Sequence, residues 1–248
     1  AQFACRAVTQ LVIDPADSRV IYAGTNDGLL QSMDGGNSWV SLPLGTTQDV
    51  ILSLVVHPEH TRLLYVGAGG TVWRSVDRGA HWQPADEGAP SFAAYCLALH
   101  PWNPNVVYAG ADDGIYVTTD GGGKWHQTSN GLPTGTQVQA LAIDPRNPLR
   151  LYAGTSAGLY TSQDGGSNWK ALAQKGGPGS ASVILVDKED HKLYVGGAHG
   201  DFYQSVDDGE NWASLGKLEA DLPILSLVMQ RASPCQFYAG TACGIWAS

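Results

Sequence analysis

Polar side chains that could do chemistry recur in short loops of this sequence, each loop following a segment that contains Tyr-x-Gly. They are Asn26, Asp27, Asp112, Asp113, His199 and Asp201. Two carboxyl groups roughly 6.5–9.5 Å apart can hydrolyse a glycosidic bond with inversion, one as acid and one as base. Asp113 and Asp201 are the candidate catalytic pair. The same acidic loops could instead bind a sugar, a cation or a basic protein surface, or be solvated loop residues without a ligand.

A second polar series stands at the ends of apolar segments and could in principle ligate a metal. Each of its members begins a turn, where Asp or His side chains accept hydrogen bonds from backbone N–H groups. We therefore expect caps, no metal site and no cofactor. The glycine-rich segment GAGGT (67–71) precedes no helix and predicts no phosphate site. The series consists of Asp14, His57, His100, Asp144, Asp187 and Gln230.

The elements that carry these residues repeat along the chain. A motif S/T-x-D-x-G-x-x-W occurs five times, and its aspartates are spaced by 43, 43, 44 and 43 residues. A period of this length indicates a propeller, a solenoid or another repeat array. The motif residues are Asp34, Trp39, Asp77, Trp82, Asp120, Trp125, Asp164, Trp169, Asp207 and Trp212.

Each repeat has the pattern of four short strands. The first, at 11–14 in the first copy, is apolar on both faces and predicts a strand covered on both sides. The second, at 21–25, alternates Tyr with small residues, which suits close packing against a neighbouring sheet. The third spans 28–32, and the fourth begins at the tryptophan of the motif.

The motif itself predicts a hairpin turn rather than a binding loop. Its aspartate accepts hydrogen bonds from nearby N–H groups, and the glycine at its fifth position adopts positive φ at low cost. The tryptophan can cover the gap between adjacent repeats with a large apolar surface. Five equivalent copies favour a structural role.

This motif resembles the Asp-box, or BNR, repeat. The fuller pattern is similar to the propeller repeats of photosystem II assembly factors, sortilin-like receptors and xyloglucanases, and it covers nearly the whole chain. The resemblance implies an all-β propeller and says little about function, because such propellers include enzymes, receptors and assembly factors. It also implies that the Asp-box turns lie away from the ligand face.

The repeats predict one domain, residues 1–248, with six four-stranded antiparallel blades. Six first strands and six second strands are present, but only five Asp-boxes. We expect a closing 3+1 blade made of the N-terminal strand and the three C-terminal strands, with the N-terminal strand pairing onto 244–248. The alternative is an edge that accepts a strand from a neighbouring molecule. The repeats span about 9–51, 52–94, 95–138, 139–181, 182–224, and 225–248 together with 1–8.

The cysteines lead to two open alternatives. Closure would bring Cys5 near Cys235 or Cys243, and a disulfide there would indicate an oxidising compartment. Four buried thiols are the other possibility, and Cys96 is expected as a thiol in a buried strand. The N-terminus lacks Met and reads as a processed end. We expect a secreted, periplasmic or cell-surface location.

Composition limits the classes of molecule that this chain is expected to bind. The net charge is −9 and only 14 residues are basic, so nucleic acid is not expected as a partner. No apolar run is long enough to span a bilayer, so membrane insertion is not expected either. The arginines do not lie where a sialidase-type clamp would need them. We therefore expect a non-catalytic scaffold that binds a protein or a glycan, with an Asp-box glycoside hydrolase and a strand-exchanged assembly subunit as alternatives.

Overall fold

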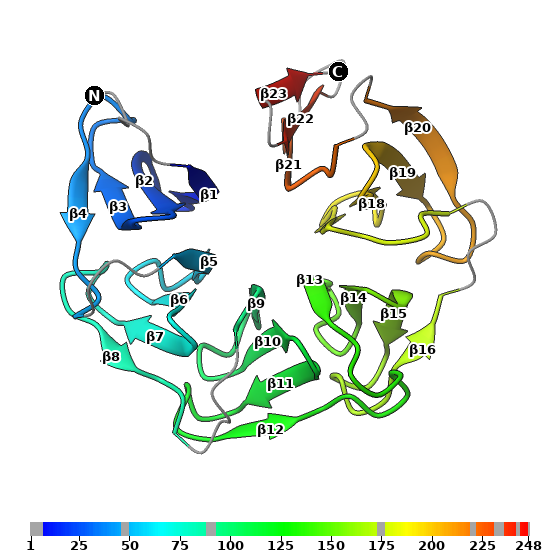
Figure 1. Cartoon of the computed structure of the whole chain (residues 1–248), viewed down its shortest axis with the longest axis horizontal. Coiled ribbons are helices and arrows are strands. Elements are labelled where there is room, and N and C mark those ends of the chain that lie inside the picture. The colour runs from blue at the N-terminus through cyan, green and yellow to red at the C-terminus, as the bar shows by residue number, and fades with distance from the viewer. Residues whose placement is uncertain are drawn as a thin grey trace. The chain divides into compact units, whose positions relative to one another are not determined.

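The described residues form 23 strands and no helix, in a computed structural model that covers residues 7–45, 50–87, 93–172, 177–218, 222–230, 236–241 and 244–247. The strands make six antiparallel sheets, the blades of a six-bladed β-propeller (Figure 1). The predicted fold class is confirmed. The chain divides into two compact units, residues 1–127 and 128–248, with three blades each.

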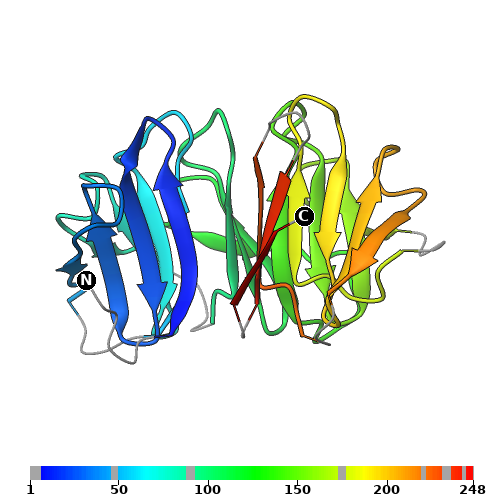
Figure 2. The same cartoon turned by 90° about the horizontal axis from the view of Figure 1, so that it is seen from above.

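The first unit holds three four-stranded blades, each with its strands in chain order. The strands of the first blade run side by side in Figure 2 (blue). The strands are β1 (Val8–Asp14), β2 (Asp17–Thr25), β3 (Gly28–Ser32) and β4 (Val40–Leu42); β5 (Ile51–Val56), β6 (Leu64–Ala68), β7 (Thr71–Ser75) and β8 (Gln83–Pro84); and β9 (Cys96–Leu99), β10 (Val107–Ala111), β11 (Gly114–Thr118) and β12 (Trp125–Gln127).

The second unit holds two four-stranded blades and one in which the described residues form three strands. The strands are β13 (Val138–Ile143), β14 (Leu151–Thr155), β15 (Gly158–Ser162) and β16 (Lys170–Ala171); β17 (Val183–Val186), β18 (Leu193–Gly196), β19 (Asp201–Ser205) and β20 (Ala213–Lys217); and β21 (Ser226–Gln230), β22 (Gln236–Thr241) and β23 (Gly244–Ala247).

The predicted closing strand falls largely outside the described residues, because residues 1–6 and 248 are not among them. Val8, which we expected in that strand, lies in β1 opposite Thr25. The three disulfide candidates, Cys5, Cys235 and Cys243, also lie outside the described residues. Cys96 is a thiol, and burial raises its pKa to about 12.

Apolar clusters fill the seams between adjacent blades within each unit. One cluster joins the first and second blades through Tyr22, Ile51 and Leu64. The first strands are less uniformly covered than predicted, since Leu11 and Ile13 of β1 are 57% and 55% exposed. Within the first unit, the described residues place no sheet over that face of β1.

The aspartate of each motif closes its turn through a fixed set of hydrogen bonds. In the first copy, the Ser32 hydroxyl donates to Asp34 Oδ1 (2.8 Å) and accepts from the Gly36 N–H (2.8 Å). Asp34 Oδ1 also accepts the Ser38 N–H (2.8 Å). These bonds, with the Ser38 hydroxyl the largest cause, lower the pKa of Asp34 to about 2. Gly36 has φ 91°, as the turn requires.

The tryptophans lie between blades. Trp125 and Trp169 are 5% and 3% exposed. Each indole N–H donates to a carbonyl of the preceding blade at 2.7 Å, to Ala85 for Trp125 and to Thr128 for Trp169. Trp39 differs, because its indole N–H donates to Gly36 of its own turn (3.0 Å). Trp125 and Trp169 are thus tied to chain that precedes their own blades, whereas Nε1 of Trp82 is buried without a hydrogen-bond partner among the described residues.

Tyrosines of the second strands bind the next blade's turn. The Tyr65 hydroxyl donates to the Gly121 carbonyl (3.2 Å), and the Tyr22 hydroxyl donates to the Arg78 carbonyl (3.4 Å). The glycine two residues after the tyrosine allows a second close approach, to the chain before the next blade's first strand. A Cβ on Gly154 would stand 2.3 Å from the Ala181 carbonyl oxygen of the next blade.

Five of the six polar residues at the ends of the first strands cap turns, as predicted, and the side chain of the sixth, Gln230, lies outside the described part of the chain. Asp14 Oδ1 accepts the Ala16 N–H (2.8 Å), and His57 Nδ1 accepts the N–H groups of Glu59 (3.2 Å) and His60 (3.0 Å). His100 Nδ1, Asp144 Oδ1 and Asp187 Oδ1 accept in the same way. The described residues hold no group of three or more possible metal ligands.

Substitution of Gly154 by Ala should destabilise the protein by about 1–3 kcal/mol, because the new methyl group overlaps the Ala181 carbonyl. Gly179→Ala is the matched control, since a Cβ there meets no atom within 4 Å, and its effect should stay within about 0.5 kcal/mol. Urea denaturation followed by tryptophan fluorescence measures both. Equal urea midpoints for the two variants would contradict a close contact between Gly154 and Ala181.

The histidine caps should make the protein sensitive to mild acid. Burial lowers the pKa of His57 and His100 below 6.5 in the folded state, so the unfolded chain binds more protons. The stability they provide is complete above pH 6.5 and is lost as the pH falls below it. The slope is at most about 1.4 kcal/mol per pH unit for each histidine.

His57→Asn keeps a side-chain acceptor but removes the titration, so its free energy of unfolding should fall less between pH 7 and pH 5 than that of the parent chain. His126→Asn, at an exposed position, should leave the parent's pH dependence in place. Parallel curves for the parent and His57→Asn would exclude His57 as a source of acid sensitivity.

Candidate functional site

Two of the predicted polar loops are two-residue hairpin turns in the first unit. Asn26 and Asp27 join β2 to β3, where Thr25 pairs with Gly28. Asp112 and Asp113 join β10 to β11 in the same way, between Ala111 and Gly114. Because both strands continue directly from these turns, the polar side chains are held on rigid supports rather than on long loops.

Tyrosine hydroxyls hold both carboxylates of the second turn. The Tyr95 hydroxyl donates to Asp112 Oδ1 (2.7 Å), and the Tyr116 hydroxyl donates to Asp113 Oδ2 (2.9 Å). Burial and then the Asp113 carboxylate raise the pKa of Tyr116 to about 12, so the phenol remains a donor. Both aspartates are exposed. The turn therefore presents two oriented carboxylates to solvent.

Asn26 has a structural partner. Its side-chain oxygen accepts the Ala7 N–H (3.0 Å), and its own N–H donates to the Ala7 carbonyl (3.0 Å). Asp27 lies next to it, with its N–H donated to the Thr25 hydroxyl (3.1 Å). Asn26, which is exposed, thus fixes the chain that leads into β1, and Asp27 is half-buried.

His199 and Asp201 lie in the second unit, at the turn from β18 to β19. His199 is exposed, and Asp201 begins β19 opposite Lys217. The Asp201 carbonyl accepts the Gly197 N–H (2.8 Å). Asp113 belongs to the first unit and Asp201 to the second, so their pairing as acid and base stays a prediction.

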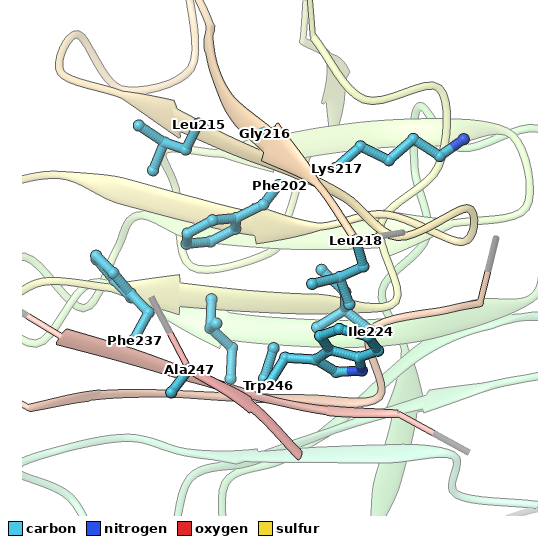
Figure 3. Close-up of a pocket in the computed structure, with 11 residues that line it drawn as sticks. Phe202, Leu215, Gly216, Lys217, Leu218, Ile224, Phe237, Trp246 and Ala247 are labelled. Atoms are coloured by element: carbon cyan, nitrogen blue, oxygen red, sulfur yellow. The ribbon is translucent and has the colours of Figure 1, made fainter. Parts of the chain in front are cut away.

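An apolar cavity of about 180 Å³ lies between the last two blades of the second unit. Figure 3 shows the rings of Phe202 and Phe237 on one side of it and Leu218, Ile224 and Trp246 on the other. The two phenyl rings meet edge to face, with centroids 5.1 Å apart. Strand β23, which carries Trp246, pairs with β22.

Sequence reasoning missed this cavity, although two substitutions pointed to it. Phe202 occupies a repeat position that holds Leu, Val or Ile in the five other blades, and Phe237 replaces the aliphatic residue that precedes the second-strand tyrosine. Enlarged aromatic side chains at two facing positions were the available signal.

The fold is shared with several solved structures of low sequence identity. An ancestral GH74 enzyme matches with a TM-score of 0.78 and 18% identity over 97% of this chain and 38% of that chain. The GH74 xyloglucanase from Xanthomonas campestris matches with 0.72 and 18% over 97% and 45%. YCF48 bound to D1 peptide matches with 0.65 and 17% over 98% and 78%. The chain thus spans less than half the length of these GH74 proteins, and the likeness establishes the fold alone.

No curated protein sequence matches this chain. Among the described residues, no helix could reach across a lipid bilayer. The profile of sortilin, neurotensin receptor 3, matches residues 26–133. The profile of the DUF6242 beta propeller domain matches residues 103–234, which is more than half of the sequence, and the chain therefore belongs to the DUF6242 β-propeller domain family.

Proposed function

We propose that this chain is a non-catalytic binding propeller that recruits a basic protein partner outside the cytoplasm. The proposal depends on the tyrosine-held carboxylates of Asp112 and Asp113. Each is exposed, and each keeps further lone pairs for a ligand. Fixed carboxylates on a rigid turn suit charge-assisted hydrogen bonds with Lys or Arg side chains.

Charge and fold support a protein partner. The net charge of −9 attracts a basic surface over long range and speeds its association. YCF48, which shares the fold, has been solved with a bound peptide. The location outside the cytoplasm is supported by the match to the sortilin profile, whose description names a receptor.

Hydrolysis of a glycoside is less well supported, although two of the similar structures are GH74 enzymes. A general acid in such a reaction needs a raised carboxyl pKa. Among the described residues, the aspartates with a shifted pKa have it lowered by hydrogen bonds, as in Asp17 and Asp77, both at about 2. The tyrosine contacts at Asp112 and Asp113 use phenol donors to hold an acceptor, which suits binding better than proton donation.

A peptide array rich in Lys and Arg, read beside a glycan array, tests this proposal. The parent chain should retain basic peptides, and the double variant Asp112→Asn and Asp113→Asn should bind them at least about 100-fold more weakly, since each of the two charge-assisted bonds contributes about 1.5–3 kcal/mol. Retention should also weaken as salt is raised.

Glu210→Gln is the matched control, because it removes an exposed charge at an Asp-box turn of the second unit and should leave binding unchanged. A parallel panel of polysaccharides gives the opposing readout. Release of reducing sugar that disappears in Asp113→Asn or Asp201→Asn would replace the binding proposal with a hydrolase. Binding confined to the glycan array would replace the protein partner with a carbohydrate.

The cavity of Figure 3 favours a second function, as a subunit joined to a neighbour by strand exchange. Among the described residues, β23 pairs only with β22, and the cavity beside it is lined by apolar side chains. An edge strand next to an apolar cavity can accept an extended segment that adds a strand and inserts one apolar side chain. The sequence offers Phe3 in the N-terminal segment as that side chain.

Phe3→Asp separates the possible donors. If the segment binds its own chain, the parent is monomeric by light scattering and Phe3→Asp lowers its melting temperature. If a neighbour donates the segment, the parent forms concentration-dependent oligomers that Phe3→Asp dissociates. Val40→Asp, at an exposed position of β4, is the control. No change in either property with Phe3→Asp would exclude this use of the cavity.

A further inference from the structure

Three arginines line one concavity on the second blade, on the side of the Asp-box turns. The concavity has a volume of about 490 Å³ and is bordered by Arg62, Arg74 and Arg78, together with Glu59 and His60. The whole chain has eight arginines and a net charge of −9. This site is therefore a local concentration of positive charge on an acidic protein.

The repeat does not require these arginines. The position of Arg74 holds Gln31 in the first blade, and the position of Arg78 holds glycine in three of the other four boxes, among them Gly121. Arg78 has φ 64°, a left-handed conformation that costs a residue with a Cβ of the order of 1 kcal/mol. A charged residue kept where glycine would relax the backbone points to a use for its side chain.

The backbone and one tyrosine arrange the three side chains. The Arg78 N–H donates to the Arg62 carbonyl (3.0 Å), which brings these two residues side by side. Arg74 Nε donates to the Tyr65 hydroxyl (3.0 Å). With its Nε engaged, Arg74 is oriented with its two terminal nitrogens available for a ligand, in the geometry that matches an oxyanion.

The nearby carboxylates do not neutralise all of the positive charge of these arginines. Asp14 Oδ2 lies 3.9 Å from Arg78 Nε, too far for a hydrogen bond, and Arg78 Nε is buried without a hydrogen-bond partner. The Asp77 carboxylate accepts from Ser75 and His81 instead. Glu59 borders the same concavity, and Asp14 lies near Arg78 alone. Three arginines beside these two carboxylates leave an excess of positive charge.

We propose that Arg62, Arg74 and Arg78 form a binding site for an oxyanion, the carboxylate, sulfate or phosphate group of a ligand. Two or three planar guanidinium forks can each donate a pair of hydrogen bonds to such a group. The site lies at the Asp-box turns and does not involve the hairpin loops that carry Asp112 and Asp113. It thus goes beyond the proposed function and stands or falls separately from it.

Calorimetric titration of the intact chain with acetate, sulfate and phosphate, each at constant ionic strength in chloride, tests the site. The parent should bind at least one of them saturably with one site per chain. The order among the three anions identifies the group, since acetate is planar and the others are tetrahedral. Arg74→Gln and Arg78→Gly, which restore residues found in other blades, should each weaken binding about tenfold or more.

Two readouts separate lost binding from lost folding. Arg78→Gly should melt at the same temperature as the parent or higher, because glycine adopts positive φ without strain. Arg146→Gln removes an exposed arginine from a turn of the second unit and should leave the affinity unchanged. The proposal would be overturned if the parent bound none of the three anions saturably. It would also be overturned if the parent, Arg74→Gln and Arg78→Gly bound the anions with equal affinity.

Discussion

The hydrogen-bonded Asp-box turn sets how closely each blade can approach the one before it. The hydroxyl at the start of the box accepts the glycine N–H and donates to the aspartate, and this fixes the glycine at positive φ. The glycine then faces the outer strand of the preceding blade. A Cβ on Gly79 would stand 2.7 Å from Leu42, and a Cβ on Gly122 would stand 2.5 Å from Ala85. The turn is largely exposed, so its main effect is to shape a seam that apolar side chains fill.

The box turns and the strand-end caps stabilise the seams between blades. The residues at that end of a blade can therefore vary less in type than the residues at the other end. At the box end, Asp34 and its equivalents use their oxygens within their own turns. At the hairpin end, the turn needs only a pair such as Thr25 and Gly28 to close, and the two residues between them can vary. Asp112 and Asp113 occupy such a turn. The scaffold therefore leaves polar variation where it costs the fold least.

Most of the fold could be predicted from the sequence, because the same pattern of strand and turn residues occurs in every blade. The third strands, such as Gly28–Ser32 and Thr71–Ser75, match their predicted bounds. The first strands are longer than their apolar cores indicate, since β1 begins at Val8. Pairing continues past an irregularity between Val8 and Gln10, and backbone pairing of this kind leaves no signal in residue type.

The candidate sites were less predictable, because they depend on departures from the repeat. The tyrosine partners of Asp112 and Asp113 come from the segment before β9 and from β11, and residue spacing alone does not reveal which hydroxyl reaches which carboxylate. The cavity beside Trp246 and the left-handed backbone of Arg78 depend on the packing of side chains between blades. Aligned repeats mark such departures by residue type, as at Phe202 and Arg78, but the cavity and the backbone conformation that result are seen only in the structure.

The tyrosine contacts across the seams have one further effect on how such a chain can change. Tyr22 and Tyr65 bind backbone carbonyls of the next turn, so the joint does not depend on which side chain the turn residue carries. Where that residue is Asp208, the Tyr152 hydroxyl reaches its carboxylate at 3.5 Å instead. Because the tyrosine binds main-chain atoms, the residue at this turn position can change in type while the contact between blades is kept.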